Sequence, residues 1–377
     1  MPKPSEPLDR IRRRRKRAPN AAAVIEFLEY LAPPSLAVPE EPYGVQVGTS
    51  SSEVRAIVVA PVASFNALSA AAARKHALLV TAAPLITTPF TALCLDDPIA
   101  AKVAYLVKHS ITLYALPNTY AAAPGGFDDA LAEQLGLAAT TPLQPTAFEP
   151  QYKIAFYVPE DHAQRVFAAA AEAGAGRIGA YTHCSFQTRG TGTFLPQHGA
   201  RPTIGSVGRL ERVEELRIEM IVPQRELQGV IAAIIDAHPY EEVAYDVYVV
   251  KNPGAFYGRG RLGELPLKVA LDTVLAQIQD VLGSPAIRCS HKPDFLISSL
   301  AVAAGVNQKL FWLAARAGAG AFITGGASLQ DMMLADNSTT VLIDIGYAAS
   351  VMPGLRRLCT QLEKTFGTDG VEVVYVE

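Results

Sequence analysis

The chain has 377 residues, enough for two or three domains, and 50% of them are hydrophobic, which is typical of a globular protein. No apolar run approaches the roughly 18 residues of a membrane-spanning helix, and the start lacks the apolar core of a signal peptide. These features argue against an integral membrane protein and predict a cytoplasmic location.

Cysteine usage also favours a cytoplasmic location. The four cysteines are Cys94, Cys184, Cys289 and Cys359. They form no C-x-x-C pair, which argues against a disulfide framework or a zinc knuckle. We expect them to be reduced and buried.

The net charge of −3 conceals a basic segment at the start. Residues 1–20 carry eight Lys or Arg against Glu6 and Asp9, a local charge of +6. The densest run consists of Arg10, Arg12, Arg13, Arg14, Arg15, Lys16 and Arg17. Like charges this dense repel one another, so residues 1–19 are predicted to be a disordered tail. Two roles stay open: weak contact with nucleic acid or an anionic surface, and solubilisation without a partner.

Residues 20–150 are predicted to form the first half of an α/β core. A helix with an apolar face covers 24–31. The predicted strands are 56–60, 77–81 and 111–115, and the helices among them are 64–75, 97–109 and 128–137. Short apolar strands between helices imply a mainly parallel sheet covered on both faces. Pro142, Pro145 and Pro150 are predicted to mark a linker.

Residues 151–251 read as a complete domain inserted into that core. The predicted strands are 154–158, 181–186, 216–222 and 243–249, and the predicted helices are 162–173 and 224–238. The order strand, helix, strand, strand, helix, strand is the ferredoxin-like βαββαβ arrangement.

Two glycine runs match G-x-G-x-x-G, the pattern of a dinucleotide-binding turn. Gly174, Gly176 and Gly179 leave a helix and enter a strand, the reverse of the order that the fingerprint needs. We interpret them as a helix C-cap followed by a tight turn. The second run begins at Gly258 and leads into Pro266, which is incompatible with a following helix, so we predict no dinucleotide site there either.

Residues 252–377 are predicted to form the second half of the core, after a return segment at 251–260. The predicted strands are 295–298, 321–324, 340–345 and 371–376, and the predicted helices are 306–317 and 354–366. Ligands of such sheets sit beyond the carboxyl ends of the strands. The segments to inspect are therefore 81–84, 116–120 and 346–351.

Several motifs together carry a resemblance to one family. In the insert they are 174–194, 205–213 and the pentapeptide His238-Pro239-Tyr240-Glu241-Glu242. Outside it they are 31–37, 44–48, 122–126, 260–265 and 353–355. In this order they resemble the Nif-three-like family, whose members are called GTP cyclohydrolase type 2 homologues and carry a PII-like (CutA-like) insert. The resemblance runs from Asn20 to the end of the chain.

The resemblance implies a dinuclear metal site at the strand ends, but this chain departs from the family at each ligand position. The positions hold Ala82, Ala83, Ala121, Tyr347 and Val351 in place of two His, an Asp, a His and a Glu. Alanine and valine offer no lone pair, and a phenol with its high pKa binds a divalent cation poorly. A further His-His before Asp331 is replaced by Leu329 and Gln330. No cofactor is therefore predicted.

The histidine of the pentapeptide is the other metal candidate. His238 with Glu241 and Glu242 has the composition of a metal cluster. Pro239 ends the helix there, however, and adjacent carboxylates at the start of a strand point to opposite faces. We therefore favour a structural corner.

The sequence favours the first of three functions, of which the third and weaker is nucleic-acid binding through the basic tail. The first is a non-catalytic, degenerate Nif-three-like scaffold or regulatory protein without the metal pair. The second is a hydrolase of a nucleotide or small metabolite, using a relocated metal or a pocket between insert and core. The resemblance also implies a homo-oligomer, a hexamer built as a trimer of dimers.

Overall fold

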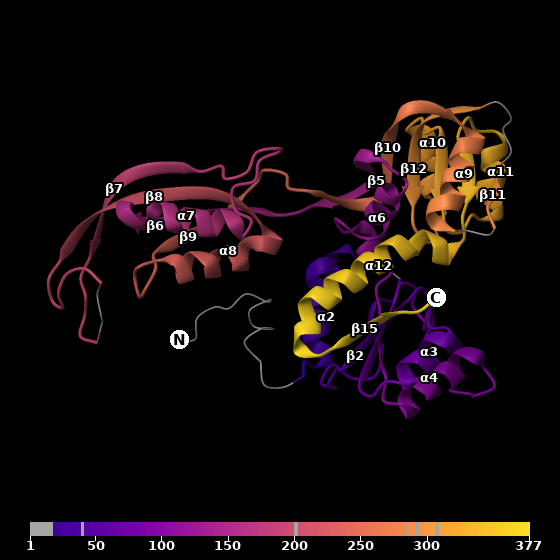
Figure 1. The fold of residues 1–377 in the computed structure, drawn as a ribbon, viewed down its shortest axis with the longest axis horizontal. Coiled ribbons are helices and arrows are strands. Elements are labelled where there is room, and N and C mark those ends of the chain that lie inside the picture. The colour runs from indigo at the N-terminus through magenta and orange to yellow at the C-terminus, as the bar shows by residue number, and fades with distance from the viewer. Residues whose placement is uncertain (1–17, 39–40, 200–202, 284–285, 291–294, 307–308) are drawn as a thin grey trace. The chain divides into compact units, whose positions relative to one another are not determined.

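The computed structural model describes residues 18–38, 41–199, 203–283, 286–290, 295–306 and 309–377. The chain forms two compact units (Figure 1). One is Phe148–Ala255, and the other combines the described residues 18–147 with Phe256–Glu377. The basic run at residues 10–17 lies outside the described residues.

The first sheet of the larger unit has five strands in the order β1-β4-β3-β2-β15. They are β1 (Gly44–Val47), β2 (Ala56–Ala60), β3 (Ala77–Thr81), β4 (Thr112–Ala115) and β15 (Glu372–Tyr375). All pairs are parallel except β1 with β4. Every residue of β2 and β3 is buried, as expected for parallel strands covered on both faces. The predicted parallel α/β core is confirmed, whereas β1 lies where the sequence predicts no strand.

Helices follow the strands of this first half. They are α2 (Ala21–Leu31), η1 (Pro34–Leu36), α3 (Phe65–Ala72), α4 (Pro98–Lys108), α5 (Asn118–Ala122) and α6 (Phe127–Gln134). Three of them begin at side chains that accept hydrogen bonds from free backbone N–H groups: Asn20 before α2, Ser64 before α3 and Asp97 before α4. Local capping therefore fixes where these helices start.

The second sheet has six strands in the order β11-β14-β13-β12-β10-β5. They are β5 (Ala138–Phe148), β10 (Phe256–Ala270), β11 (Arg288–Cys289), β12 (Leu296–Ala303), β13 (Ala321–Thr324) and β14 (Val341–Asp344). β12, β13 and β14 are parallel, and β10 and β11 are antiparallel to their partners in this group.

Two predictions about this sheet are wrong. Pro142 and Pro145 lie within β5 and not in a linker. β5 lies at the edge of the sheet. Proline is tolerated in an edge strand because no further strand needs its missing N–H group. The return segment predicted at 251–260 ends early, because β10 already begins at Phe256.

The helices of the second half are α9 (Leu271–Leu282), α10 (Leu310–Arg316), α11 (Leu329–Asp336), α12 (Tyr347–Phe366) and η3 (Gly367–Asp369). The sequence predicts neither α9 nor α11, and it places the start of α12 at Gly354. The helix instead begins at Tyr347 and contains Pro353. Close packing holds this stretch in place, since a Cβ on Gly354 would lie 2.5 Å from the Phe127 ring of α6.

The smaller unit consists of β6 (Gln151–Pro159), η2 (Glu160–His162), α7 (Ala163–Glu172), β7 (Phe186–Phe194), β8 (Glu211–Pro223), α8 (Gln224–Ala237) and β9 (Tyr245–Val250). Its sheet order is β7-β8-β6-β9, with every pair antiparallel. This is the strand order of a ferredoxin-like unit. Alternate residues of β6 and β8 form one core with the buried faces of α7 and α8.

The second strand of this unit is not where the sequence places it. The segment predicted as a strand at 181–186 is instead part of a turn, and β7 runs from Phe186 to Phe194. The earlier glycines behave as predicted: Gly174, Gly176 and Gly179 all have positive φ, after the end of α7. The sequence misplaces this strand because β7 is largely exposed and therefore shows no hydrophobic alternation.

His238 forms the corner between α8 and the segment leading to β9. Its Nε2 lies 2.9 Å from the backbone oxygen of Tyr157, and its Nδ1 accepts a hydrogen bond from the Tyr240 N–H at 3.1 Å. Both contacts are satisfied by a neutral ring protonated at Nε2. Burial lowers the pKa of His238, which is consistent with that neutral state. Both ring nitrogens thus contact backbone atoms, as expected for a structural corner.

One buried carboxylate joins the two halves of the larger unit. Asp128 of α6 is fully buried and accepts hydrogen bonds from the backbone N–H groups of Gly260 (2.6 Å) and Ala304 (2.8 Å). It also pairs with Arg259 of β10, at 3.2 Å from Oδ2 to Nε. Next to it, Asp129 pairs with Arg261 of the same strand. The first half therefore holds β10 and the end of β12 through two adjacent acids.

Two further properties concern the chain as a whole. No described helix is both long and apolar enough to cross a bilayer. The four cysteines are free thiols, but only Cys359 is buried, and Cys94 is exposed, so the prediction that all are buried is wrong.

We predict that Asp128→Asn destabilises the larger unit by about 3–5 kcal/mol, because it removes the buried carboxylate that pairs with the buried Arg259. Trp312, the single tryptophan, lies in this unit, so its fluorescence during urea unfolding reports the change. The control is Glu133→Gln on the same helix, which removes a surface pair with Arg357 and is expected to cost less than about 1 kcal/mol. Equal effects of the two substitutions would contradict a central role for Asp128.

We predict that the smaller unit loses stability as the pH falls. An unfolded histidine binds a proton near pH ~6.5, whereas folded His238 resists protonation, so acid favours the unfolded state through that range. His238→Gln should flatten this dependence, and His198→Gln, which changes an exposed ring of the same unit, should leave it unchanged. The stability of both variants can be measured from urea unfolding at several pH values, with the NMR signal of the buried Met220 methyl group as the probe. An unchanged slope in His238→Gln would show that another group causes it.

Candidate functional site

The strand ends of the first sheet hold three of the five positions at which the resemblance implies metal ligands. Ala82 and Ala83 directly follow β3, and their N–H groups donate to the backbone oxygens of Ala60 and Pro61 beside them. Ala121 lies on α5, which follows the neighbouring strand β4, and it is buried. The three alanines thus follow adjacent strands at one edge of the sheet.

The other two positions lie at the start of α12, beyond β14 of the second sheet. Val351 is buried, and Tyr347 is half-buried with its ring against Gly305, where an added Cβ would lie 3.3 Å from Cε2. Gly305 has a φ of +76°, so both its conformation and the neighbouring ring favour glycine.

The phenol of Tyr347 connects the two sets of positions. Burial raises its pKa, the nearby carboxylate of Glu41 raises it further, and Arg259 opposes both. Glu41 also accepts hydrogen bonds from the backbone N–H (3.3 Å) and the side-chain amide of Asn118 at the start of α5. The beginnings of α5 and α12 therefore lie near one carboxylate.

These residues do not fit a pair of divalent metal ions. Four of the five positions are aliphatic, and the raised pKa of Tyr347 disfavours the phenolate that would bind a cation. Within the described residues, no three His, Cys, Asp or Glu side chains are grouped so that they could hold a metal ion. The donor set therefore supports no metal-dependent step.

Neighbouring acids are already engaged in structural contacts. Asp344, at the end of β14, accepts hydrogen bonds from Ala327 N (3.1 Å) and Gly346 N (3.0 Å) and pairs with Arg288 at 2.7 Å. Asp331 forms a reciprocal capping box with Ser328 at the start of α11. Leu329 and Gln330, in the first turn of this helix, are exposed. These acids position loops and helix ends.

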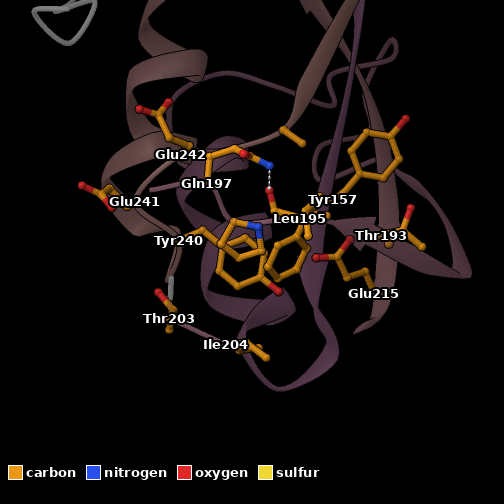
Figure 2. Close-up of a pocket in the computed structure, with 14 residues that line it drawn as sticks. Tyr157, Thr193, Leu195, Gln197, Thr203, Ile204, Glu215, Tyr240, Glu241 and Glu242 are labelled. Carbon is orange, nitrogen blue, oxygen red and sulfur yellow. Dashed lines mark hydrogen bonds between the residues drawn. The ribbon is translucent and has the colours of Figure 1, made fainter. Parts of the chain in front are cut away.

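A cavity that the sequence did not predict lies inside the smaller unit. Its volume is about 450 Å³, and its lining comes from β6, β7, β8, the loop after β7 and the His238 corner. Figure 2 shows Tyr240 near its centre, with the Glu215 side chain pointing toward that ring. Glu241 and Glu242 lie at the edge and point away. The sequence signals closest to it are the family-like motifs at 174–194 and 238–242, which contribute Gly192 and Tyr240 to the lining.

The comparisons with known proteins cover nearly the whole chain. The model of the family described as Duf34/NIF3 (NGG1p interacting factor 3) matches residues 19–377. A "GTP cyclohydrolase 1 type 2 homolog" of Bacillus subtilis is 34% identical over 358 residues, covering 93% of this chain and 95% of the relative. A protein of the same name from Mycobacterium leprae is 34% identical over 353 residues, covering 92% and 91%.

Solved structures agree with the sequence comparisons. A Bacillus cereus protein related to NIF3 has a TM-score of 0.79 at 32% identity, and the match covers 96% of this chain and 98% of that one. The Staphylococcus aureus protein SA1388 shares the fold at a TM-score of 0.63 and 22% identity, covering 95% and 96%. The family model and the curated relatives both span the two halves of the core and the insert, and the chain belongs to the Duf34/NIF3 family.

Proposed function

We propose that this chain is a non-catalytic member of the family, a scaffold or regulatory protein that has lost two-metal chemistry. The observation that carries the proposal is the donor set at the strand ends. Ala82, Ala83, Ala121 and Val351 have no donor atom, and the phenol of Tyr347 is held protonated by burial and by Glu41. Two-metal hydrolysis needs several converging imidazoles or carboxylates to hold both ions a few ångströms apart.

The competing function is a hydrolase, in line with the name of the curated relatives, that uses a relocated metal. A relocated site needs acids or imidazoles that are free to converge. Asp128, Asp331 and Asp344 are each bound by backbone N–H groups or basic side chains. His238 donates and accepts through its two ring nitrogens. These commitments favour the non-catalytic alternative.

We predict that protein purified without chelators contains well under one equivalent of Zn, Fe, Mn, Ni or Co per chain, because one phenol cannot replace several ligands. Elemental analysis measures this content directly. The positive control restores the ligands in one variant: Ala82→His, Ala83→His, Ala121→Asp, Tyr347→His and Val351→Glu. Its circular dichroism should first show that it is folded.

The restored variant should take up metal that the unmodified chain does not. Two tightly held equivalents in the unmodified chain, lost in Tyr347→Phe, would contradict the proposal and place a metal on the phenol. Two equivalents that persist in Tyr347→Phe would support the relocated-metal hydrolase.

We also propose that the protein is a homo-oligomer, a hexamer built as a trimer of dimers. Large apolar side chains are exposed on two helices of the larger unit that contact each other: Trp312 on α10, and Leu329, Met333 and Leu334 on α11. Figure 1 labels both helices. Exposed apolar groups gathered on neighbouring elements are typical of interaction surfaces. We infer that a second copy of the chain covers this α10–α11 surface.

Light scattering after gel filtration should therefore give a mass of about six times the 40.2 kDa of the chain. Trp312→Glu should lower this mass, because it places a charge at the centre of an apolar contact. Val107→Glu is the matched control, since Val107 is also exposed but lies on α4. A 40.2 kDa monomer at micromolar concentration would contradict the assembly.

Two further properties complete the proposal. The four free thiols favour a reducing compartment, and we propose a cytoplasmic location. Contact of the basic run at residues 10–17 with nucleic acid or an anionic surface stays a prediction, because these residues lie outside the described structure.

A further inference from the structure

The cavity of the smaller unit is built from the sequence motifs that the core site leaves unexplained. Gly192, Thr193 and Phe194 of β7 form one side, and Tyr240, Glu241 and Glu242 of the pentapeptide form another. The first group ends the motif at 174–194, and the second lies about 50 positions along the chain. Motifs far apart in the sequence therefore converge on one cavity, which is independent of the metal-ligand positions.

Hydrogen bonds connect the walls of this cavity. Thr203 donates to the backbone oxygen of Pro239 at 3.1 Å, and Gly208 donates to that of Pro196 at 2.9 Å. Gln197 donates to the backbone oxygen of Leu195 at 3.4 Å, as Figure 2 shows. The loop after β7 is thus fastened both to itself and to the His238 corner. The cavity is a built feature of the unit.

The body of the cavity is apolar. The rings of Phe194 and Tyr240 lie 6.3 Å apart, inclined at 57°, and Leu195, Pro196 and Ile204 add aliphatic surface. A volume of about 450 Å³ falls within the range of small-molecule sites. These surfaces suit an aromatic or branched aliphatic group.

The charged side chains that line the cavity are acidic. Glu215 of β8 points into it, Glu241 and Glu242 stand at its edge, and no described lining residue is Lys or Arg. Gly192 makes room for the acid, because a Cβ there would lie 2.2 Å from Glu215 Oε2. This combination disfavours phosphate groups and favours a positive charge.

Tyr240 adds a second polar group beside Glu215. Its hydroxyl is buried and has no hydrogen-bond partner among the described residues. Burial raises the pKa of Tyr240, and the nearby Glu215 carboxylate raises it further, so this acid and this hydroxyl lie close together. A buried hydroxyl without a partner is costly, and a ligand that bonds to it would remove that cost.

We propose that this cavity binds a small organic cation with an apolar body, of the arylalkylamine class. The ammonium group lies against Glu215 and the hydroxyl of Tyr240, and the body packs on Phe194, Leu195 and Ile204. Aromatic faces next to a carboxylate favour an ammonium group through cation–π attraction as well as through charge. The inference needs neither the metal pair nor its loss.

Three probes with one indole body and different charges test the proposal: tryptamine (cation), tryptophol (neutral) and indole-3-acetate (anion). Isothermal titration of the full-length protein near pH ~7.5 should show tryptamine binding at least about tenfold more tightly than tryptophol. Indole-3-acetate should not bind detectably. Equal affinity for all three probes, or preference for the acid, would overturn the proposal, as would no binding of tryptamine at millimolar concentration.

Substitutions then locate the charge. Glu215→Gln should weaken tryptamine binding by about tenfold or more and leave tryptophol unchanged. Glu214→Gln is the matched control, because it removes the same charge from the adjacent, exposed position of β8. If Glu215→Gln fails to fold, Tyr240→Phe provides the second test and should weaken tryptamine binding several-fold. Equal losses in the Glu215 and Glu214 variants would overturn the assignment.

Discussion

The buried carboxylate of Asp128 is the contact on which the architecture of the core depends. It belongs to α6 in the first half, yet its hydrogen bonds reach Arg259 and Gly260 of β10 and Ala304 after β12. A charge without solvent must keep its partners, so these segments are fixed relative to one another. Gly305 follows Ala304 directly and lies against the Tyr347 ring.

Because of this arrangement, the stability of the scaffold does not depend on the side chains at its strand ends. Asp344 holds the turn around Ala327 and the start of α12, and Ser350 accepts a hydrogen bond from Gly305 N at 2.9 Å. None of these anchors involves the side chains of Ala82, Ala83, Ala121 or Val351. The strand ends can therefore change from metal-binding to apolar residues while the anchors keep the fold.

How much of this structure the sequence predicts depends on whether an element has its own hydrophobic period. β2 and β3, buried on both faces, and α8, with its apolar stripe, are found directly. β7 is exposed, β5 contains prolines, and β10 carries Arg259 and Arg261, so none shows a strand pattern. The arginines are buried only because acids of α6, about 130 positions away in sequence, neutralise them. Such long-range pairing leaves no local signal.

The two candidate sites differ in how far the sequence predicts them. The strand-end positions are predictable because they belong to short motifs that follow strands, and their chemistry follows from residue identity. The acidic cavity is not predictable from the sequence. Glu215 occupies an ordinary position of an alternating strand, and only the fold brings it close to Tyr240. Gly192 indicates close approach of another group only once β7 is known, since the sequence does not place it within a strand. The strand-end positions are mostly apolar and the cavity of the insert is acidic, so the proposed absence of metal binding at the first and the proposed cation binding at the second rest on different residues.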